Sequence, residues 1–278
     1  MLNRNLAVVA DTKKITPSQL TKVAAALQKQ ATRDFGPLWD IQANVSGFAR
    51  LQDVPTDYWP VIVRDDIKTP GAAGVHEDKN RQPFALVQFS DAWSLTASHE
   101  TLEMLADPFG NRLVAGKSPK RAQGRVNFLV EVCDPSEDQQ FAYTVNGVTV
   151  SDFYTPHFFD PVAESSVRYS YTGAVKGPRT ILRGGYLSWG VPETNEWFQM
   201  IWFDTEKPVF RSLGVLGGTG SLRAAIDRLT PTPLETTKLP AKSPLMAAAR
   251  NAFDEVGDAC VSRAKFLRKQ IEEIKKAK

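Results

Sequence analysis

The chain has 278 residues, of which 42% are hydrophobic and 23% charged, a composition typical of a globular protein with one large domain or two small ones. The net charge of +3 is too small to indicate nucleic-acid binding, and no apolar run approaches the roughly 20 residues that span a membrane. The amino terminus has too short an apolar stretch for a signal peptide, and two cysteines give no disulfide framework, so the sequence predicts a cytoplasmic protein.

The first predicted elements are a strand and a long helix. Residues 6–10 form a short apolar run that is typical of a strand. Thr16 followed by Pro17 indicates a helix start, because threonine is a favoured N-cap and proline is tolerated at the first helical position. The apolar spacing predicts that this helix continues to about Asp34, where Gly36 and Pro37 end it.

Three strands are predicted after this helix. They are indicated by aromatic and β-branched residues over the ranges 39–48, 58–64 and 83–89. Residues 71–82 are rich in glycine and charge and predict a loop or a hairpin. His76 lies in this polar segment, where we expect a solvated side chain.

A second helix is predicted directly after the last of these strands. Asp91 or Ser94 is expected to cap it, and it ends at Asp107 because the residue before a proline is pushed out of the α region. The apolar residues expected to pack into the core are Trp93, Leu95, Leu102 and Leu105.

This helix carries the motif around which the functional hypothesis is built. His99 and Glu103 are four residues apart, so they lie on one helix face a turn apart and direct two metal-binding side chains to one spot. Glu100 lies about 100° around the helix from His99, close enough to hold a water molecule on that metal. The pattern resembles the His-Glu-x-x-His helix of zinc metallopeptidases, in which the first Glu is the general base. Here Glu103 replaces the second histidine.

The second half of the chain is predicted to be mainly β structure. A basic loop over residues 108–125 leads into an apolar strand over residues 126–133. Asn146 and Gly147 predict a type I′ hairpin turn, because both residue types tolerate positive φ. Further strands are predicted over residues 167–175, 180–189 and 196–203.

The last part carries a glycine-rich turn, a short helix, a linker and a longer helix. Residues 214–220 lack the Lys-Ser/Thr of a phosphate-binding loop, so we interpret them as a turn before a helix over residues 221–229. Four prolines predict an extended linker at residues 230–244. Residues 245–278 predict a basic amphipathic helix, either docked on the body or frayed, or used for self-association or a partner.

A catalytic zinc ion needs about three protein ligands and one open position, so His99 and Glu103 require a further ligand downstream. Glu131 is the first choice, because an acid inside an apolar strand needs a partner or a metal. The next choices, in descending order, are Asp107, His157 and Asp134.

Each candidate also has a purely structural interpretation. His99 is then a helix histidine bonded to a carboxylate, and Glu103 and Glu131 form ion pairs or face solvent. His157 is then a loop histidine packed among aromatic residues, and Cys133 is a small buried side chain.

Three stretches together are similar to one group of proteins: Ser98-His-Glu-Thr-Leu-Glu-Met-Leu-Ala-Asp-Pro108, Glu131-Val-Cys-Asp134 and Val150-Ser-Asp-Phe-Tyr-Thr-Pro156. They resemble a poorly characterised group of bacterial zincin-like metallopeptidases, which also carry a His-Glu-x-x-Glu helix ending in Asp-Pro. The resemblance extends from the start of the chain to about Asp160. It implies a zincin-type fold and a bound metal.

We therefore expect an α+β fold: a zincin-like twisted sheet with the motif helix, a mainly β second half and a carboxyl-terminal helix. The expected domains are residues 1–229, with the linker at 230–244 and the basic helix at 245–278. The expected cofactor is zinc or another divalent metal, since two carboxylate ligands make the ion less electrophilic.

The functional hypothesis is a metal-dependent peptidase acting on a peptide or protein substrate, with no nucleic-acid or membrane partner. Glu100 takes the proton of a metal-activated water, and His157, Tyr154 or Tyr143 supplies a donor for the developing oxyanion. The alternative is a catalytically inactive zincin-like scaffold that serves as a binding module. A third interpretation is a hydrolase of another amide or ester.

Overall fold

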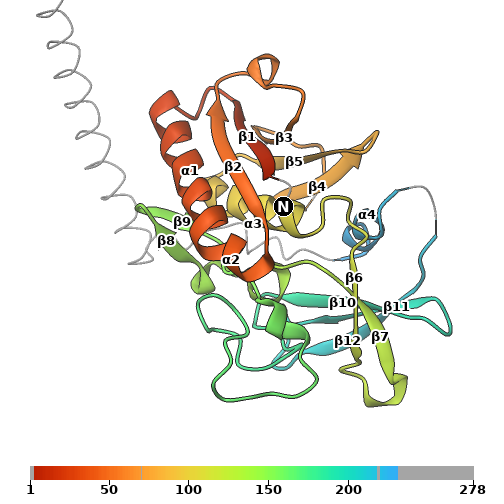
Figure 1. Ribbon diagram of the computed structural model, residues 1–278. Helices are drawn as coiled ribbons and strands as arrows, with labels where there is room; N and C mark the ends of the chain where they lie inside the picture. Colours follow the sequence, from red (N-terminus) through yellow and green to blue (C-terminus); the bar gives the residue numbers. More distant parts are fainter. Residues whose placement is uncertain (1–2, 70, 218–219, 231–278) are drawn as a thin grey trace, which may run out of the picture.

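The structure is a computed structural model, and it describes residues 3–69, 71–217 and 220–230. Within these ranges the chain forms a mixed α/β fold with two five-stranded sheets and a two-stranded hairpin (Figure 1). Apart from Thr230, the predicted linker at 230–244 and the predicted helix at 245–278 lie outside the described residues. None of the described helices has both the length and the apolar character that crossing a bilayer requires.

The amino-terminal sheet has the strand order β2-β1-β3-β5-β4. All neighbours run parallel except β4, which pairs antiparallel with β5 at the edge. The strands are β1 (Asn3–Asp11), β2 (Gln42–Phe48), β3 (Tyr58–Arg64), β4 (Gly74–Lys79) and β5 (Gln82–Gln88). Consecutive residues of β1 from Leu6 to Val9 are buried, as expected for a central parallel strand covered on both faces. The three predicted strands are confirmed, and the segment at 71–82 contributes β4.

Helix α1 (Pro17–Lys29) begins as predicted. The side chain of Thr16 accepts a hydrogen bond from the Gln19 amide, and the Gln19 side chain accepts one from the Thr16 amide, which completes a capping box. The predicted helix end at Gly36 and Pro37 is wrong, because both belong to the next helix, α2 (Gly36–Trp39), which ends at the left-handed Asp40. Proline at a first-turn position costs no hydrogen bond. A Cβ at Gly36 would meet backbone oxygens at 2.5 and 2.8 Å, so only glycine fits there.

A π-helical turn (Gln30–Phe35) connects α1 to α2 and brings Gln30 into the interior. Gln30 Nε2 donates to the Ser151 carbonyl (3.0 Å), and Gln30 Oε1 accepts from Ser98 Oγ (2.7 Å). The Ser151 amide in turn donates to Ser98 Oγ (2.9 Å). The three buried residues thereby tie the π turn to α3 (Trp93–Ala106) and to the chain after β9.

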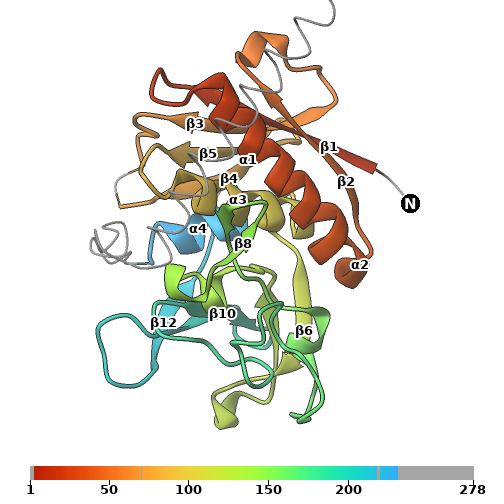
Figure 2. The same cartoon turned by 90° about the vertical axis from the view of Figure 1, so that its left-hand side faces the viewer.

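Helix α3 is the motif helix, and it lies between the two sheets (Figure 2), where it packs against β4, β5 and β9. Its amino terminus differs from the prediction: the N-cap is Ala92, and Ser94 Oγ donates to the Thr149 carbonyl. The end at Ala106, followed by Asp107, is as predicted. Ten of its 14 residues are buried, which includes charged ones.

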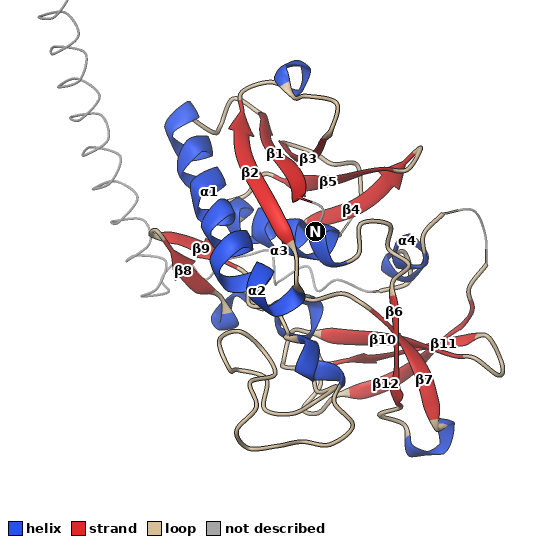
Figure 3. Ribbon diagram, in the orientation of Figure 1, coloured by secondary structure: helices blue, strands red, loops and turns tan. Residues whose placement is uncertain are grey.

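The second sheet is antiparallel, with the order β12-β11-β10-β7-β6 (Figure 3). Its strands are β6 (Leu113–Lys117), β7 (Arg125–Leu129), β10 (Tyr186–Val191), β11 (Glu196–Ile201) and β12 (Val209–Val215). Beside it lies the hairpin β8 (Tyr143–Val145) and β9 (Val148–Val150), and positive φ at Asn146 and Gly147 confirms the predicted turn type. Helix α4 (Leu222–Asp227) starts at the N-cap Ser221, close to its predicted position.

Four predictions for this half are wrong. The strand predicted over residues 180–189 begins only at Tyr186, with β10. Residues 108–125 contain β6 instead of being loop throughout, and the strand predicted over 126–133 ends at Leu129. Residues 167–175 form no strand: Tyr171 and Thr172 donate their amides to Phe153 and Asp152, and the chain turns at Gly173. Those backbone groups are therefore satisfied outside any sheet.

Candidate metal centre

The predicted motif residues lie in a buried cluster of charged side chains at the junction of four segments. It consists of His76 from β4; His99, Glu100 and Glu103 from α3; Glu131, Cys133, Asp134 and Glu137 from the segment after β7; and Arg223 and Asp227 from α4. The side chains of Glu100, Glu103, Glu131, Asp134 and Arg223 are at most 5% exposed. We refer to these ten residues as the acidic cluster.

His99 lies between two carboxylates. Its Nε2 is 3.3 Å from Glu103 Oε2 and 3.2 Å from Asp134 Oδ1. Burial by itself lowers the pKa of His99, but the charge of Glu103 and the hydrogen bond with Asp134 outweigh it and raise that pKa well above the ordinary value. In the metal-free protein the ring is therefore an imidazolium that links α3 to the segment after β7.

Glu103 is ionised and engaged at both of its oxygens. Oε1 accepts the Cys133 amide at 3.2 Å, and Oε2 accepts Arg223 Nη1. Burial tends to raise the pKa of Glu103, but the charge of Arg223, followed by that of His99, holds it well below its usual range. The predicted approach of His99 and Glu103 is present, although Arg223 shares the carboxylate.

The downstream candidates differ in where they lie. Glu131 follows the end of β7, so it is not an acid inside a strand as expected, and its Oε1 is 3.7 Å from Arg223 Nη1. Asp107 Oδ2 accepts the Arg112 amide (2.6 Å). His157 is exposed and pairs with Asp160 at 2.8 Å. Within the described part of the chain, Asp134 is the one of these four that forms an ion pair with His99.

Among the described residues, three sets of side chains bring possible ligand atoms within 4.8 Å of one another: His99 with Glu103 and Cys133, His76 with Glu100 and Glu103, and His99 with Asp134 and Glu137. His99 belongs to two of these sets, and none includes Glu131, Asp107 or His157. Glu103 and Asp134 flank the same imidazole nitrogen but share no set.

His76 is 2% exposed, so the expectation of a solvated side chain is wrong. Its Nε2 lies 3.0 Å from the Asp107 carbonyl oxygen, which can only accept, so Nε2 carries the hydrogen. In the neutral ring Nδ1 is then an acceptor, and it faces Glu100 Oε2 at 3.6 Å and Glu103 Oε2 at 3.8 Å. Three acceptors facing one another favour a proton or a cation between them.

Acidic side chains outnumber basic ones in the cluster. Burial, followed by the charge of Asp134, raises the pKa of Glu131 well above its usual value, and burial raises the pKa of Asp227 to about 6. Burial, followed by the charge of Glu103, likewise raises the pKa of Asp134. Beyond His99, neither Asp134 oxygen has a hydrogen-bond partner, and Glu100 Oε2 has none. These acids favour an additional cation.

Of the proposed oxyanion donors, only Tyr154 is close to the acids. Its pKa is raised by burial and then by the charges of Glu131, Glu103 and Asp134, and its hydroxyl has no partner. The Tyr143 hydroxyl donates to Asp34, and His157 lies at the surface.

The sequence reasoning missed His76 and Arg223. Arg223 lies in a short helix with Leu222 and Ile226, and an arginine four residues before Asp227 was readable as one half of an ion pair. Nothing in the sequence alone connects that helix to α3.

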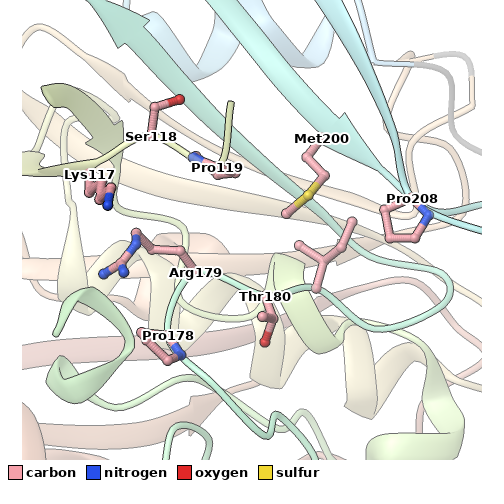
Figure 4. Close-up of a pocket in the computed structure, with 9 residues that line it drawn as sticks. Lys117, Ser118, Pro119, Pro178, Arg179, Thr180, Met200 and Pro208 are labelled. Carbon is pink, nitrogen blue, oxygen red and sulfur yellow. The ribbon is translucent and has the colours of Figure 1, made fainter. Parts of the chain in front are cut away.

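An open hollow of about 430 Å³ lies elsewhere, at the second sheet (Figure 4). It is lined by Lys117, Ser118, Pro119, Pro178, Arg179, Thr180, Ile181, Met200 and Pro208, none of which belongs to the acidic cluster. The Arg179 guanidinium is already engaged by the carbonyls of Asp160 and Pro161. The hollow therefore does not lead to the candidate metal ligands.

The geometry and charge of the acidic cluster are the basis for any functional conclusion. Comparisons with protein-family models, with curated proteins and with solved structures found no match to this chain.

Proposed function

We propose that the protein is a metal-dependent peptidase that holds a divalent cation, zinc by preference, with His99, Glu103 and Asp134. The observation that carries the proposal is the position of His99 Nε2, 3.3 Å and 3.2 Å from buried carboxylate oxygens of two separate segments. Two ligands, each about 2.05 Å from one tetrahedral zinc ion, are separated by about 3.3 Å. Asp134 thus replaces Glu131 as the preferred third ligand.

The residues present fit such an ion in chemistry, and His99 lies at ligand spacing from each carboxylate, while Glu103 and Asp134 would have to approach each other to share the ion. Beyond His99, the two buried oxygens of Asp134 have no donor, and buried acceptors without partners are costly unless a cation satisfies them. One imidazole and two carboxylates are a ligand set that zinc accepts, whereas magnesium and calcium prefer oxygen alone. The excess of acids around Arg223 supports a positive ion at this place.

A divalent cation there would polarise a carbonyl group and make a water molecule more acidic. Glu100 can take the proton at Oε2, which has no hydrogen-bond partner and faces His76 Nδ1 at 3.6 Å. His76 keeps its Nε2 hydrogen on the Asp107 carbonyl, so Nδ1 is free to share that proton. The unpartnered Tyr154 hydroxyl is the candidate donor to a developing oxyanion.

The choice of peptide bonds as substrate depends on the resemblance to zincin-like metallopeptidases. The order of elements is consistent with that resemblance, since a twisted sheet with strands β1 to β5 leads directly into the motif helix α3. Cleavage of a peptide library tests the substrate class separately from metal binding.

A second candidate, a scaffold without metal, is favoured by one observation. Arg223 neutralises Glu103 through a direct ion pair, so part of the cluster is stable without an added cation. The two candidates predict different metal contents for the purified full chain.

The test is metal analysis of the full chain after dialysis against zinc, with a peptide library for cleavage. The peptidase proposal predicts one ion per chain, lost in Asp134→Asn and in Glu103→Gln but retained in Glu100→Gln, with cleavage abolished in all three. Asp160→Asn, at the exposed partner of His157, is the matched control and should behave as the wild type. A folded wild type without stoichiometric metal, or with metal but no cleavage of any peptide, would contradict the proposal.

A further inference from the structure

Arg223 projects from α4 into the centre of the acidic cluster. Its Nη1 contacts Glu103 Oε2 directly and lies 3.7 Å from Glu131 Oε1, while Nη2 lies 3.7 Å from Glu100 Oε2. Its Nε is 3.3 Å from Asp227 Oδ2 and has no hydrogen-bond partner. The guanidinium is 4% exposed, so a fixed positive charge occupies the middle of four carboxylates.

Arg223 binds Glu103 Oε2, the oxygen that a cation on His99 would need as a ligand. Glu103 Oε2 lies 3.3 Å from His99 Nε2, and the other oxygen, Oε1, already accepts the Cys133 amide. A carboxylate oxygen has two lone pairs, and a guanidinium beside a divalent cation is repelled by it. With Arg223 in place, Glu103 and Asp134 stay apart in separate candidate ligand sets, although both flank His99.

We propose that Arg223 and a divalent cation are alternative occupants of Glu103, so that α4 is a plug that must withdraw before the metal site can form. This inference depends on the proposed metal site. It adds an autoinhibitory contact, in which the chain's own guanidinium takes the place of the cation.

The anchoring of α4 is compatible with release. The helix has six residues, and its buried Ile226 belongs to a small apolar cluster with Leu129 and Trp197 that is separate from the main core. Figure 1 shows α4 beside the connection between α3 and β6, where the Arg223 amide donates to the Gly110 carbonyl. A segment with few buried apolar contacts is among the first to open in a native protein.

Withdrawal of α4 would also expose the acids to a substrate. Among the acidic-cluster side chains on β4 and α3, that of His99 is the most exposed, at only 12%. None of these residues lines the hollow of Figure 4. The same contact thus closes the site both to the ion and to a peptide.

Zinc binding by the full chain tests the plug, measured by calorimetry with zinc alone. Arg223→Ala and Arg223→Gln should each bind zinc at least about tenfold more tightly than the wild type, a difference of about 1.4 kcal/mol. Arg228→Ala, one turn on and exposed, is the matched control and should bind as the wild type does. Equal or weaker affinity in the Arg223 variants overturns the plug while the metal site stands. Loss of zinc binding in every folded protein, wild type included, overturns both.

Hydrogen exchange of the wild type gives a second test that needs no variant. Saturating zinc should speed amide exchange in peptides covering residues 220–230 and leave peptides of β10 unchanged. Slower or unchanged exchange in residues 220–230, with zinc bound, would show that the ion binds beside a docked Arg223 and would overturn the proposal.

Discussion

The buried carboxylate of Asp34 and the buried carboxylates of the acidic cluster differ in how far their oxygens are satisfied by hydrogen bonds. Asp34, 2% exposed, accepts hydrogen bonds from the hydroxyls of Tyr143 (2.9 Å) and Tyr171 (2.8 Å) and pairs with Arg33. Asp134 is equally buried, yet its oxygens have no hydrogen-bond partner beyond His99, at 3.2 Å from Oδ1. Neighbouring side chains therefore satisfy both oxygens of Asp34, whereas those of Asp134 lack donors other than His99.

The protonation behaviour follows this difference. Burial tends to raise the pKa of Asp34, but the hydrogen bonds from Arg33, Tyr171 and Tyr143 outweigh it and lower that pKa below its usual value. In the cluster, burial and neighbouring acids raise the pKa of Asp134 and of Glu131. A buried acid that is fully hydrogen-bonded stabilises a fold, whereas one without enough donors is a candidate for a functional role.

The largest effect is expected from removal of Asp34. Asp34→Ala leaves two half-buried tyrosine hydroxyls without their acceptor, so the free energy of unfolding should fall by about 2 kcal/mol. Urea denaturation followed by circular dichroism measures this. A fall below about 1 kcal/mol would mean that the Asp34 site is no more structural than the acidic cluster.

The corresponding substitution in the cluster should act much more weakly. Asp134→Asn removes an acid with a raised pKa from among other acids but also breaks the ion pair with His99, so the stability of the metal-free protein should change by less than about 1 kcal/mol. Zinc should raise the melting temperature of the wild type but not that of this variant. Destabilisation comparable to that of Asp34→Ala would assign Asp134 a structural role.

The pH dependence separates the two sites. Carboxyl groups whose folded pKa is raised, such as Asp227 at about 6, stabilise the fold below their unfolded pKa, and this contribution is lost as pH rises through the folded value. Asp34, with a lowered pKa, contributes stability above its unfolded pKa of about 4 that is lost as pH falls. The free energy of unfolding, measured in urea with a chelator, should therefore rise from pH 7 to pH 5 and fall below about pH 4. Asp227→Asn should flatten the first change.

The smallest effect comes from a matched pair of tyrosines. Tyr143→Phe removes a hydroxyl that donates to Asp34 and should cost about 1 kcal/mol of stability. Tyr154→Phe removes a buried hydroxyl without a partner, so stability should change by less than about 0.5 kcal/mol while peptide cleavage falls. Equal losses of stability would show that the Tyr154 hydroxyl is bonded in the native state.

Much of the local structure was readable from the sequence, because it depends on short-range rules. The Thr16 cap, the turn at Asn146 and the end of α3 before Pro108 follow from backbone preferences of single residues. The approach of His99 and Glu103 follows from helix geometry alone. These features were predicted without knowledge of any tertiary contact.

The remainder of the candidate site required the fold. The preference for Glu131 as a ligand depends on a single strand over residues 126–133. In the structure β7 ends at Leu129, and the segment after it places Asp134 beside His99. His76 is buried because β4 forms the sheet edge over α3, and Arg223 arrives through the docking of α4. No periodicity in the sequence predicts these tertiary contacts of His76 and Arg223 with α3.

The hydrogen-bonded triangle of Gln30, Ser98 and Ser151 has a consequence for the motif. Ser98 precedes His99, and its hydroxyl is held on both sides, by the Gln30 amide group 68 residues upstream and by the Ser151 backbone. One residue of rotation turns a helix by about 100°, which would swing the imidazole out of reach of both acids. The direction of the His99 side chain is therefore fixed by residues far away in the sequence. The π-helical turn near the amino terminus holds the rotational position of α3 about its axis.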